Sequence, residues 1–120
     1  MTVAEALNER ELSRYVSRVS DRWPLERALL GGARADDARG AAPQRERGPE
    51  YVVVLVSEAF DGIPWLERVH QCGSLWDAGE MGDVADVHCY TAAEFERKRV
   101  SLRRVREVAQ DGLDLLAPQA

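Results

Sequence analysis

The feature that most restricts how this chain can fold is a run of six apolar residues, YVVVLV, from Tyr51 to Val56. Four of them are valine, and β-branched side chains fit the pleated surface of a strand better than a helix. The run does not alternate between apolar and polar residues, as a strand with one face in water would. It therefore predicts a strand that is buried on both faces, at the centre of a sheet.

Two elements are predicted before this strand. Apolar residues recur at helical spacing over residues 9–22 and favour an amphipathic helix, which Asn8 and Glu11 would open as a capping box. The mostly apolar segment 25–30 then favours a strand. Residues 31–50 are rich in glycine and charged residues, so they favour a loop.

More elements are predicted after the valine-rich strand. Pro64 suits the first turn of a helix and Gly73 suits its end. Thr91 and Glu94 form a capping box that opens another helix. In order, the sequence predicts a helix from Pro64 to Gly73, a loop over 74–83, a strand over 84–90, a helix after Thr91, a last helix containing Leu102, Val105 and Val108, and a short extended segment over 113–116. This order predicts an α/β or α+β domain, with helices packed against a small sheet.

The length and charge of the chain narrow its class. Its 120 residues suffice for one domain, residues 1–120. The net charge of −5 argues against nucleic-acid binding by phosphate neutralisation, and the basic segment 97–106 is interpreted as a solvated helix face, with a local patch as the alternative. Cys72 and Cys89 are expected in the core. No apolar run approaches the ~18 residues that span a membrane, and no signal segment is expected, so the predicted location is the cytoplasm.

Two acidic residues mark a candidate site on the predicted sheet. Side chains alternate along a strand, so Asp86 shares a face with His88 and Tyr90, and Glu50 shares a face with Val52. If the two strands are neighbours, Glu50 and Asp86 can point to the same place. Two carboxylates there would raise each other's pKa or hold a divalent cation. In the alternative, both carboxylates lie at strand ends and contact only water.

Five segments of the chain follow one another in a recognisable order: RALLGG, ARADDARG, PEYVVVLVS, VADVHCYTAAEFERKR and LRRVREVAQDGLDLL. They lie between residues 27 and 116, and the resemblance that they carry covers roughly residues 8–116. In order and spacing they resemble the minimal nucleotidyltransferases of the DNA polymerase β-like superfamily. In that family the first strand ends in a Gly-Ser pair, the second opens with Asp-x-Asp, and the third carries another Asp. The resemblance implies a nucleotidyltransferase-like fold, with helices packed against a small mixed sheet.

The resemblance also implies a chemistry and a set of residues. Gly31, Gly32 and Arg34 would contact the phosphates of a nucleoside triphosphate, because glycine lets backbone amides approach them. Asp86 and Glu50 would be the catalytic carboxylates and would bind Mg²⁺, which aligns the phosphates for in-line displacement.

The match is weakest at the residues that carry this chemistry. Gly32 stands where the family has Ser, Glu50 stands at the first Asp of the pair, and Val52 stands at the second. A valine side chain has no atom that can ligate a metal. We therefore expect nucleotidyl transfer to be absent or very slow. Mg²⁺ is expected as a cofactor only if the protein is active.

Partner binding is the alternative that the resemblance implies. Minimal nucleotidyltransferases are commonly paired with a helical protein of the HEPN class in bacterial toxin–antitoxin-like systems, and an inactive scaffold would suit such an interaction module. A homodimer is a further possibility. Trp76 lies in a glycine-rich segment and is predicted to be the most exposed of the three tryptophans, which would indicate a partner surface. The segment 36–49 is expected to be a mobile loop.

Overall fold

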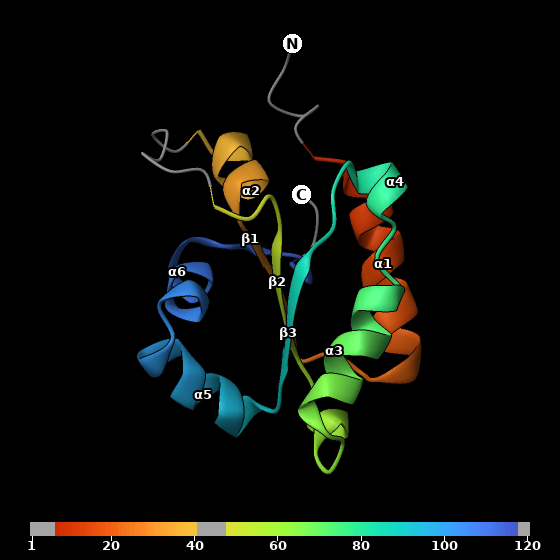
Figure 1. The fold of residues 1–120 in the computed structure, drawn as a ribbon, viewed down its shortest axis with the longest axis vertical. Coiled ribbons are helices and arrows are strands. Elements are labelled where there is room, and N and C mark those ends of the chain that lie inside the picture. Colours follow the sequence, from red (N-terminus) through yellow and green to blue (C-terminus); the bar gives the residue numbers. More distant parts are fainter. Residues whose placement is uncertain (1–6, 41–47, 118–120) are drawn as a thin grey trace.

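A four-stranded mixed sheet runs through the computed structural model, which describes residues 7–40 and 48–117 (Figure 1). The strands are β1 (Arg27–Gly31), β2 (Val52–Val56), β3 (Asp86–Tyr90) and β4 (Leu113–Asp114), in the order β3-β2-β1-β4. β2 pairs in parallel with β3, whereas β1 is antiparallel to both β2 and β4. The predicted small mixed sheet is confirmed, and the valine-rich strand lies inside it.

Helices cover both faces of this sheet (Figure 1). One face carries α1 (Glu9–Arg22), α3 (Trp65–Ser74) and α4 (Ala78–Met81), and the other carries α5 (Ala92–Ser101) and α6 (Arg103–Asp111). Side chains alternate along β2, so Val53 and Leu55 enter the core with α1 and α3, whereas Val52 and Val54 pack against α5 and α6. All five residues of β2 are buried, as the lack of alternation predicts.

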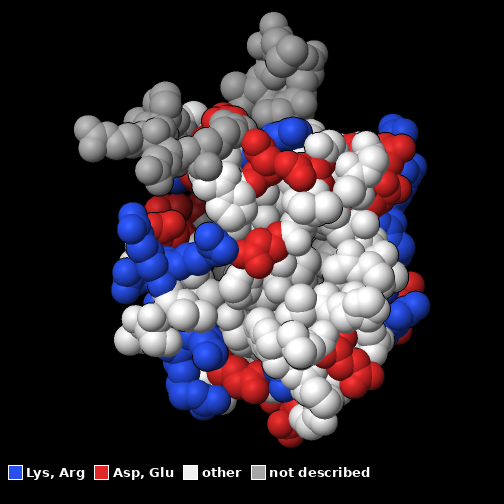
Figure 2. All heavy atoms as spheres, in the orientation of Figure 1, with Lys and Arg blue, Asp and Glu red and all other residues white. Residues whose placement is uncertain are grey.

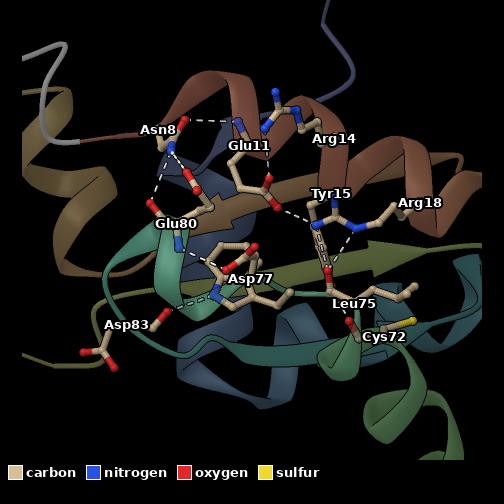
Figure 3. Close-up of polar contacts among 11 residues, drawn as sticks. Asn8, Glu11, Arg14, Tyr15, Arg18, Cys72, Leu75, Asp77, Glu80 and Asp83 are labelled. Carbon is tan, nitrogen blue, oxygen red and sulfur yellow. Dashed lines mark hydrogen bonds and ion pairs between the residues drawn. The ribbon is translucent and has the colours of Figure 1, made fainter.

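α1 has the predicted bounds, and polar contacts fix it to the C-terminal end of α3 (Figure 3). The hydroxyl of Tyr15 donates to the carbonyl oxygen of Cys72 over 2.9 Å, and Arg18 Nη2 donates to that of Leu75 over 2.8 Å. Only half of the predicted capping box forms. Asn8 accepts a hydrogen bond from the Glu11 amide, but the buried Glu11 carboxylate pairs with Arg18 instead of reaching back to Asn8.

Two short helices lie in segments that the sequence predicts to be loops. α2 (Ala33–Ala38) follows β1, where Ala33 and Ala35 are buried, so residues 36–38 of the predicted mobile loop are helical. Residues 41–47 of the predicted loop lie outside the described part of the chain. α4 forms within the predicted loop 74–83 because Asp77 accepts a hydrogen bond from the Glu80 amide over 3.0 Å and so caps it.

The remaining elements differ from the prediction mainly at their ends. α3 does not end at Gly73 but continues to Ser74, because Gly73 keeps a negative φ and so does not form a left-handed cap. A short 3-10 helix, η2 (Glu58–Phe60), follows β2. The Thr91–Glu94 capping box is present at the start of α5, as predicted.

The prediction for Trp76 is wrong. Its side chain is 8% exposed and packs edge-on against Tyr15 and Tyr51, with ring centroids 5.0 and 5.1 Å away. Its indole nitrogen donates to the carbonyl oxygen of Asp83 over 2.9 Å, which satisfies its polar atom inside the protein. Trp65 is the exposed tryptophan. Within the described residues, no helix has the length and apolar character to cross a membrane.

Candidate functional site

Asp86, His88 and Tyr90 lie along one face of β3, as their alternation predicts. His88 joins the other two, since its Nε2 lies 3.1 Å from Asp86 Oδ2 and its Nδ1 lies 2.9 Å from the Tyr90 hydroxyl. Burial raises the pKa of Tyr90 to about 12, so this hydroxyl keeps its proton at neutral pH. A neutral imidazole with its proton on Nε2 then satisfies both bonds, accepting from Tyr90 and donating to Asp86.

The carboxylate of Asp86 is also bound by a side chain of α6. Arg104, near the start of α6, donates from Nη1 to Asp86 Oδ2 over 2.7 Å, and both side chains are partly exposed. Arg104 and His88 therefore share one carboxylate oxygen. The guanidinium of Arg104 thus lies beside Asp86, the residue that the resemblance implies as a metal ligand.

Val52 lies beside Asp86. The register of β2 and β3 pairs these two residues, and partners in adjacent strands project to the same face. The Val52 side chain is 2% exposed and belongs to the apolar core beneath α5 and α6. The position of the family's second Asp is therefore filled by a well-packed apolar group.

Glu50 lies outside β2. It is in a bend two residues before β2 begins, so it does not share the strand geometry that the sequence suggests. Its carboxylate accepts a hydrogen bond from Arg34 Nε over 3.1 Å. Glu50 and Asp86 are thus each paired with a different arginine.

Arg34 is held within a cluster of its own. Its Nη1 donates to the Tyr51 hydroxyl and to the carbonyl oxygen of Met81, both over 3.3 Å, and its guanidinium lies over the Tyr51 ring. Burial raises the pKa of Tyr51, whose hydroxyl in turn donates to the Met81 carbonyl oxygen over 2.6 Å. These contacts join α2, α4 and the residue that precedes β2.

The donor set does not fit the metal that the resemblance implies. Through residues 7–40 and 48–117, no group of three or more His, Cys, Asp or Glu side chains is placed to hold a metal ion. Mg²⁺ sites of this kind need several oxygen ligands with near-octahedral geometry. Val52 supplies none, and the carboxylates of Glu50 and Asp86 face arginines.

The glycine pair is required by packing. A Cβ atom on Gly31 would lie 2.5 Å from a methyl group of Val108 on α6, and one on Gly32, whose φ is +98°, would lie 2.7 Å from the Glu50 carbonyl oxygen. The amides that follow the pair are engaged as well, since Ala33 donates to Pro49 O over 2.9 Å and Arg34 donates to Glu50 O over 3.0 Å. The turn that the sequence suggests as a phosphate site is closed by its own backbone.

A groove that the sequence did not indicate lies at the other end of β3. It has a volume of about 520 Å³ and is lined by residues of α3, β3 and α5 and by Leu102: Trp65, Arg68, His88, Tyr90, Glu94, Arg97, Lys98 and Leu102. Figure 2 shows basic side chains over α5 and α6 beside an area of uncharged side chains that faces α3. The basic stretch was visible in the sequence, but its position beside an exposed tryptophan depends on how α3 and α5 flank β3.

Arg68 and Glu94 connect the elements around this groove. Arg68 on α3 donates to Glu94 Oε1 on α5 over 2.6 Å and to the carbonyl oxygens of Ile63 and Cys89 over 2.8 and 3.2 Å. The hydrogen bonds from Arg68 hold the pKa of the Glu94 carboxyl below its usual range, and those from Thr91 act in the same direction. Glu94 is therefore ionised at neutral pH, and the pair fixes the start of α5.

The fold defined by these elements is nucleotidyltransferase-like. The chain is similar to the crystal structure of a proposed nucleotidyltransferase from Sulfolobus solfataricus, with a TM-score of 0.59 and 15% sequence identity, over 95% of this chain and 86% of that one. No protein-family model matches the sequence, and no curated protein matches it. The nucleotidyltransferase-like fold predicted from the order of the five segments is confirmed, and at this identity the similarity concerns the fold alone.

Proposed function

We propose that this chain is a non-catalytic binding protein built on the nucleotidyltransferase-like fold. The observation that carries the proposal is the surroundings of Asp86: its strand neighbour is the buried Val52, and its carboxylate is paired with Arg104. Metal-dependent transfer in this family, by resemblance, needs three carboxylates around two cations. Here one is replaced by an apolar side chain, and the other two are bound by arginine.

The missing ligand matters because the metals supply most of the charge stabilisation in such a reaction. Two-metal sites hold the attacking and leaving oxygens together, and each ~1.4 kcal/mol of lost transition-state stabilisation slows a reaction tenfold. Loss of a ligand from such a site is expected to remove several kcal/mol of this stabilisation, so that the reaction slows by several factors of ten. The glycine turn supports the same proposal, because its amides donate to Pro49 and Glu50.

A transfer assay tests the proposal directly. Purified protein would be incubated with each labelled nucleoside triphosphate and Mg²⁺ or Mn²⁺, with self-modification and transfer to added protein as readouts. We expect no product above that formed by an Asp86→Ala variant. Robust transfer that disappears in Asp86→Ala would overturn the proposal.

The alternative role, pairing with a helical HEPN-type protein or with a second copy of the chain, stays a prediction. The most exposed apolar side chains of the described residues, Leu66, Val84 and Val100, come from three separate segments. Single apolar side chains are common on protein surfaces. Light scattering on the purified chain would give its mass and so test the homodimer.

A further inference from the structure

The groove between α3 and α5 has one wall made of aromatic rings. Trp65, the first residue of α3, is 40% exposed and stacks on Tyr90 at 5.1 Å with an interplanar angle of 26°. Its ring centroid lies 6.3 Å from that of His88, with an interplanar angle of 62°, and His88 is hydrogen-bonded to Tyr90. One indole face is thus fixed from behind while the ring remains accessible, so it is ready to stack with a planar ligand.

Two cations line the same groove without a carboxylate partner among residues 7–40 and 48–117. In the basic segment of α5 and α6, Arg99 pairs with Glu96, Arg103 with Glu107 and Arg104 with Asp86. By contrast, no ion pair within the described residues involves the side chain of Arg97 or Lys98, and both line the groove. The other charges in the groove, Arg68 and Glu94, neutralise each other. The groove therefore has a positive charge that an anion would balance.

The geometry points to a binding site for a nucleoside phosphate, with the base stacked on Trp65 and the phosphate bound by Arg97 and Lys98. This inference rests on the proposed non-catalytic role and names its ligand class. Aromatic side chains stack on bases regardless of sequence, and arginine and lysine bind phosphate oxygens by charge-assisted hydrogen bonds. A volume of about 520 Å³ lies within the range of small-molecule sites.

The site differs in place from the one that the glycine pair suggested. In the turn after β1, the amides of Ala33 and Arg34 donate to backbone oxygens, and the Arg34 guanidinium is held by Glu50 and Tyr51. The groove lies next to Tyr90, the last residue of β3, whereas Asp86 is the first. A ligand in the groove needs no metal, because two side chains provide the positive charge.

Calorimetric titration in the presence of EDTA tests the inference. The probes are AMP, GMP, CMP and UMP, with adenosine as a base without phosphate and ribose 5-phosphate as a phosphate without base. We expect at least one nucleotide to bind with a sub-millimolar Kd, and adenosine and ribose 5-phosphate to bind at least about tenfold more weakly. Tryptophan fluorescence is expected to fall on binding, because the base would stack on Trp65. Trp23 and Trp76 are buried and would not contact the ligand.

Variants with a matched control locate the site. Trp65→Ala and Lys98→Glu are each expected to weaken the nucleotide at least about tenfold, and Trp65→Phe less than either. Arg106→Glu makes the same charge change as Lys98→Glu on an exposed residue outside the groove and is expected to leave the Kd within about twofold. Thermal melts would show that each variant is folded.

Absence of binding by all four nucleotides would overturn the inference, as would binding that Trp65→Ala and Lys98→Glu leave unchanged. Equal affinity for AMP and ribose 5-phosphate would also overturn it, because the base would then contribute nothing. These failures are distinct from failure of the proposed function. Transfer that depends on Asp86 would overturn that proposal and leave the groove standing, whereas the absence of nucleotide binding would do the reverse.

Discussion

The turn after β1 and the groove at the end of β3 differ in how their polar groups are used. In the turn, which comprises Gly31, Gly32 and Arg34 with Glu50, the amides of Ala33 and Arg34 and the Arg34 guanidinium already have partners within the protein. In the groove, an accessible tryptophan lies beside two cations that lack a carboxylate partner in the described residues. The order of segments in the sequence indicates the turn as a ligand site, whereas the accessible tryptophan and the two cations indicate the groove.

The largest expected effect is in the turn. Gly32→Ala is expected to lower the free energy of unfolding by about 3–4 kcal/mol, because the new Cβ would meet backbone atoms at a positive φ. Gly40→Ala is the matched control, since Gly40 also has a positive φ but no atom of the described residues lies within 4 Å of a Cβ placed there, and a cost of about 1–2 kcal/mol is expected. Urea denaturation measures both. Equal losses would show that the close packing of the turn contributes no stability.

A smaller effect is expected from Arg68, which lines the groove. Arg68→Met is expected to cost about 2–3 kcal/mol, because a buried side chain loses its hydrogen bonds to Ile63, Cys89 and Glu94 while its volume is largely kept. Arg99→Met breaks an exposed pair with Glu96 and should cost at most about 1 kcal/mol. Denaturation of both variants provides the comparison. A loss at Arg99 as large as that at Arg68 would contradict the role given to burial.

The smallest effect concerns pH and Glu94. Its carboxyl pKa is lowered in the folded protein, so its ionised form stabilises the fold above the pKa of the unfolded chain, and this stabilisation is lost as pH falls through the folded pKa. Glu94→Gln should therefore be less stable than the native chain at neutral pH, by about 1 kcal/mol or less because the side chain is partly exposed. The difference should shrink in melts taken below about pH 4. A difference that grows on acidification would contradict this assignment.

The parts of the fold that follow local rules were predicted well. The bounds of α1, the burial of β2 and the Thr91–Glu94 capping box depend on spacing within a few residues. α2 and α4 were missed because helices of six and four residues show no periodic pattern. The exposure of a side chain depends on contacts with residues far away in the sequence, which no local pattern reveals. Trp76 was therefore expected at the surface, although Tyr15 and Tyr51 cover it.

The candidate site was only partly predictable for a related reason. The alternation rule correctly placed Asp86, His88 and Tyr90 on one face of β3. The partners of the carboxylates come from other elements, Arg104 from α6 and Arg34 from α2, and no local pattern in the sequence indicates them. Register decided the rest, because it aligned Val52 rather than Glu50 with Asp86.

Arg68 has one more consequence, which concerns how the sheet ends. β3 is one of the two edge strands, and the amide of Asp86 donates to the carbonyl oxygen of Tyr51, so alternate residues such as Cys89 turn their backbone groups away from β2. Free groups along such an edge can template a strand from another molecule and start aggregation. The guanidinium of Arg68 covers the Cys89 carbonyl oxygen, so an incoming strand would have to displace a buried, ion-paired arginine. The residue that braces the groove thus also protects the open side of the sheet against self-association.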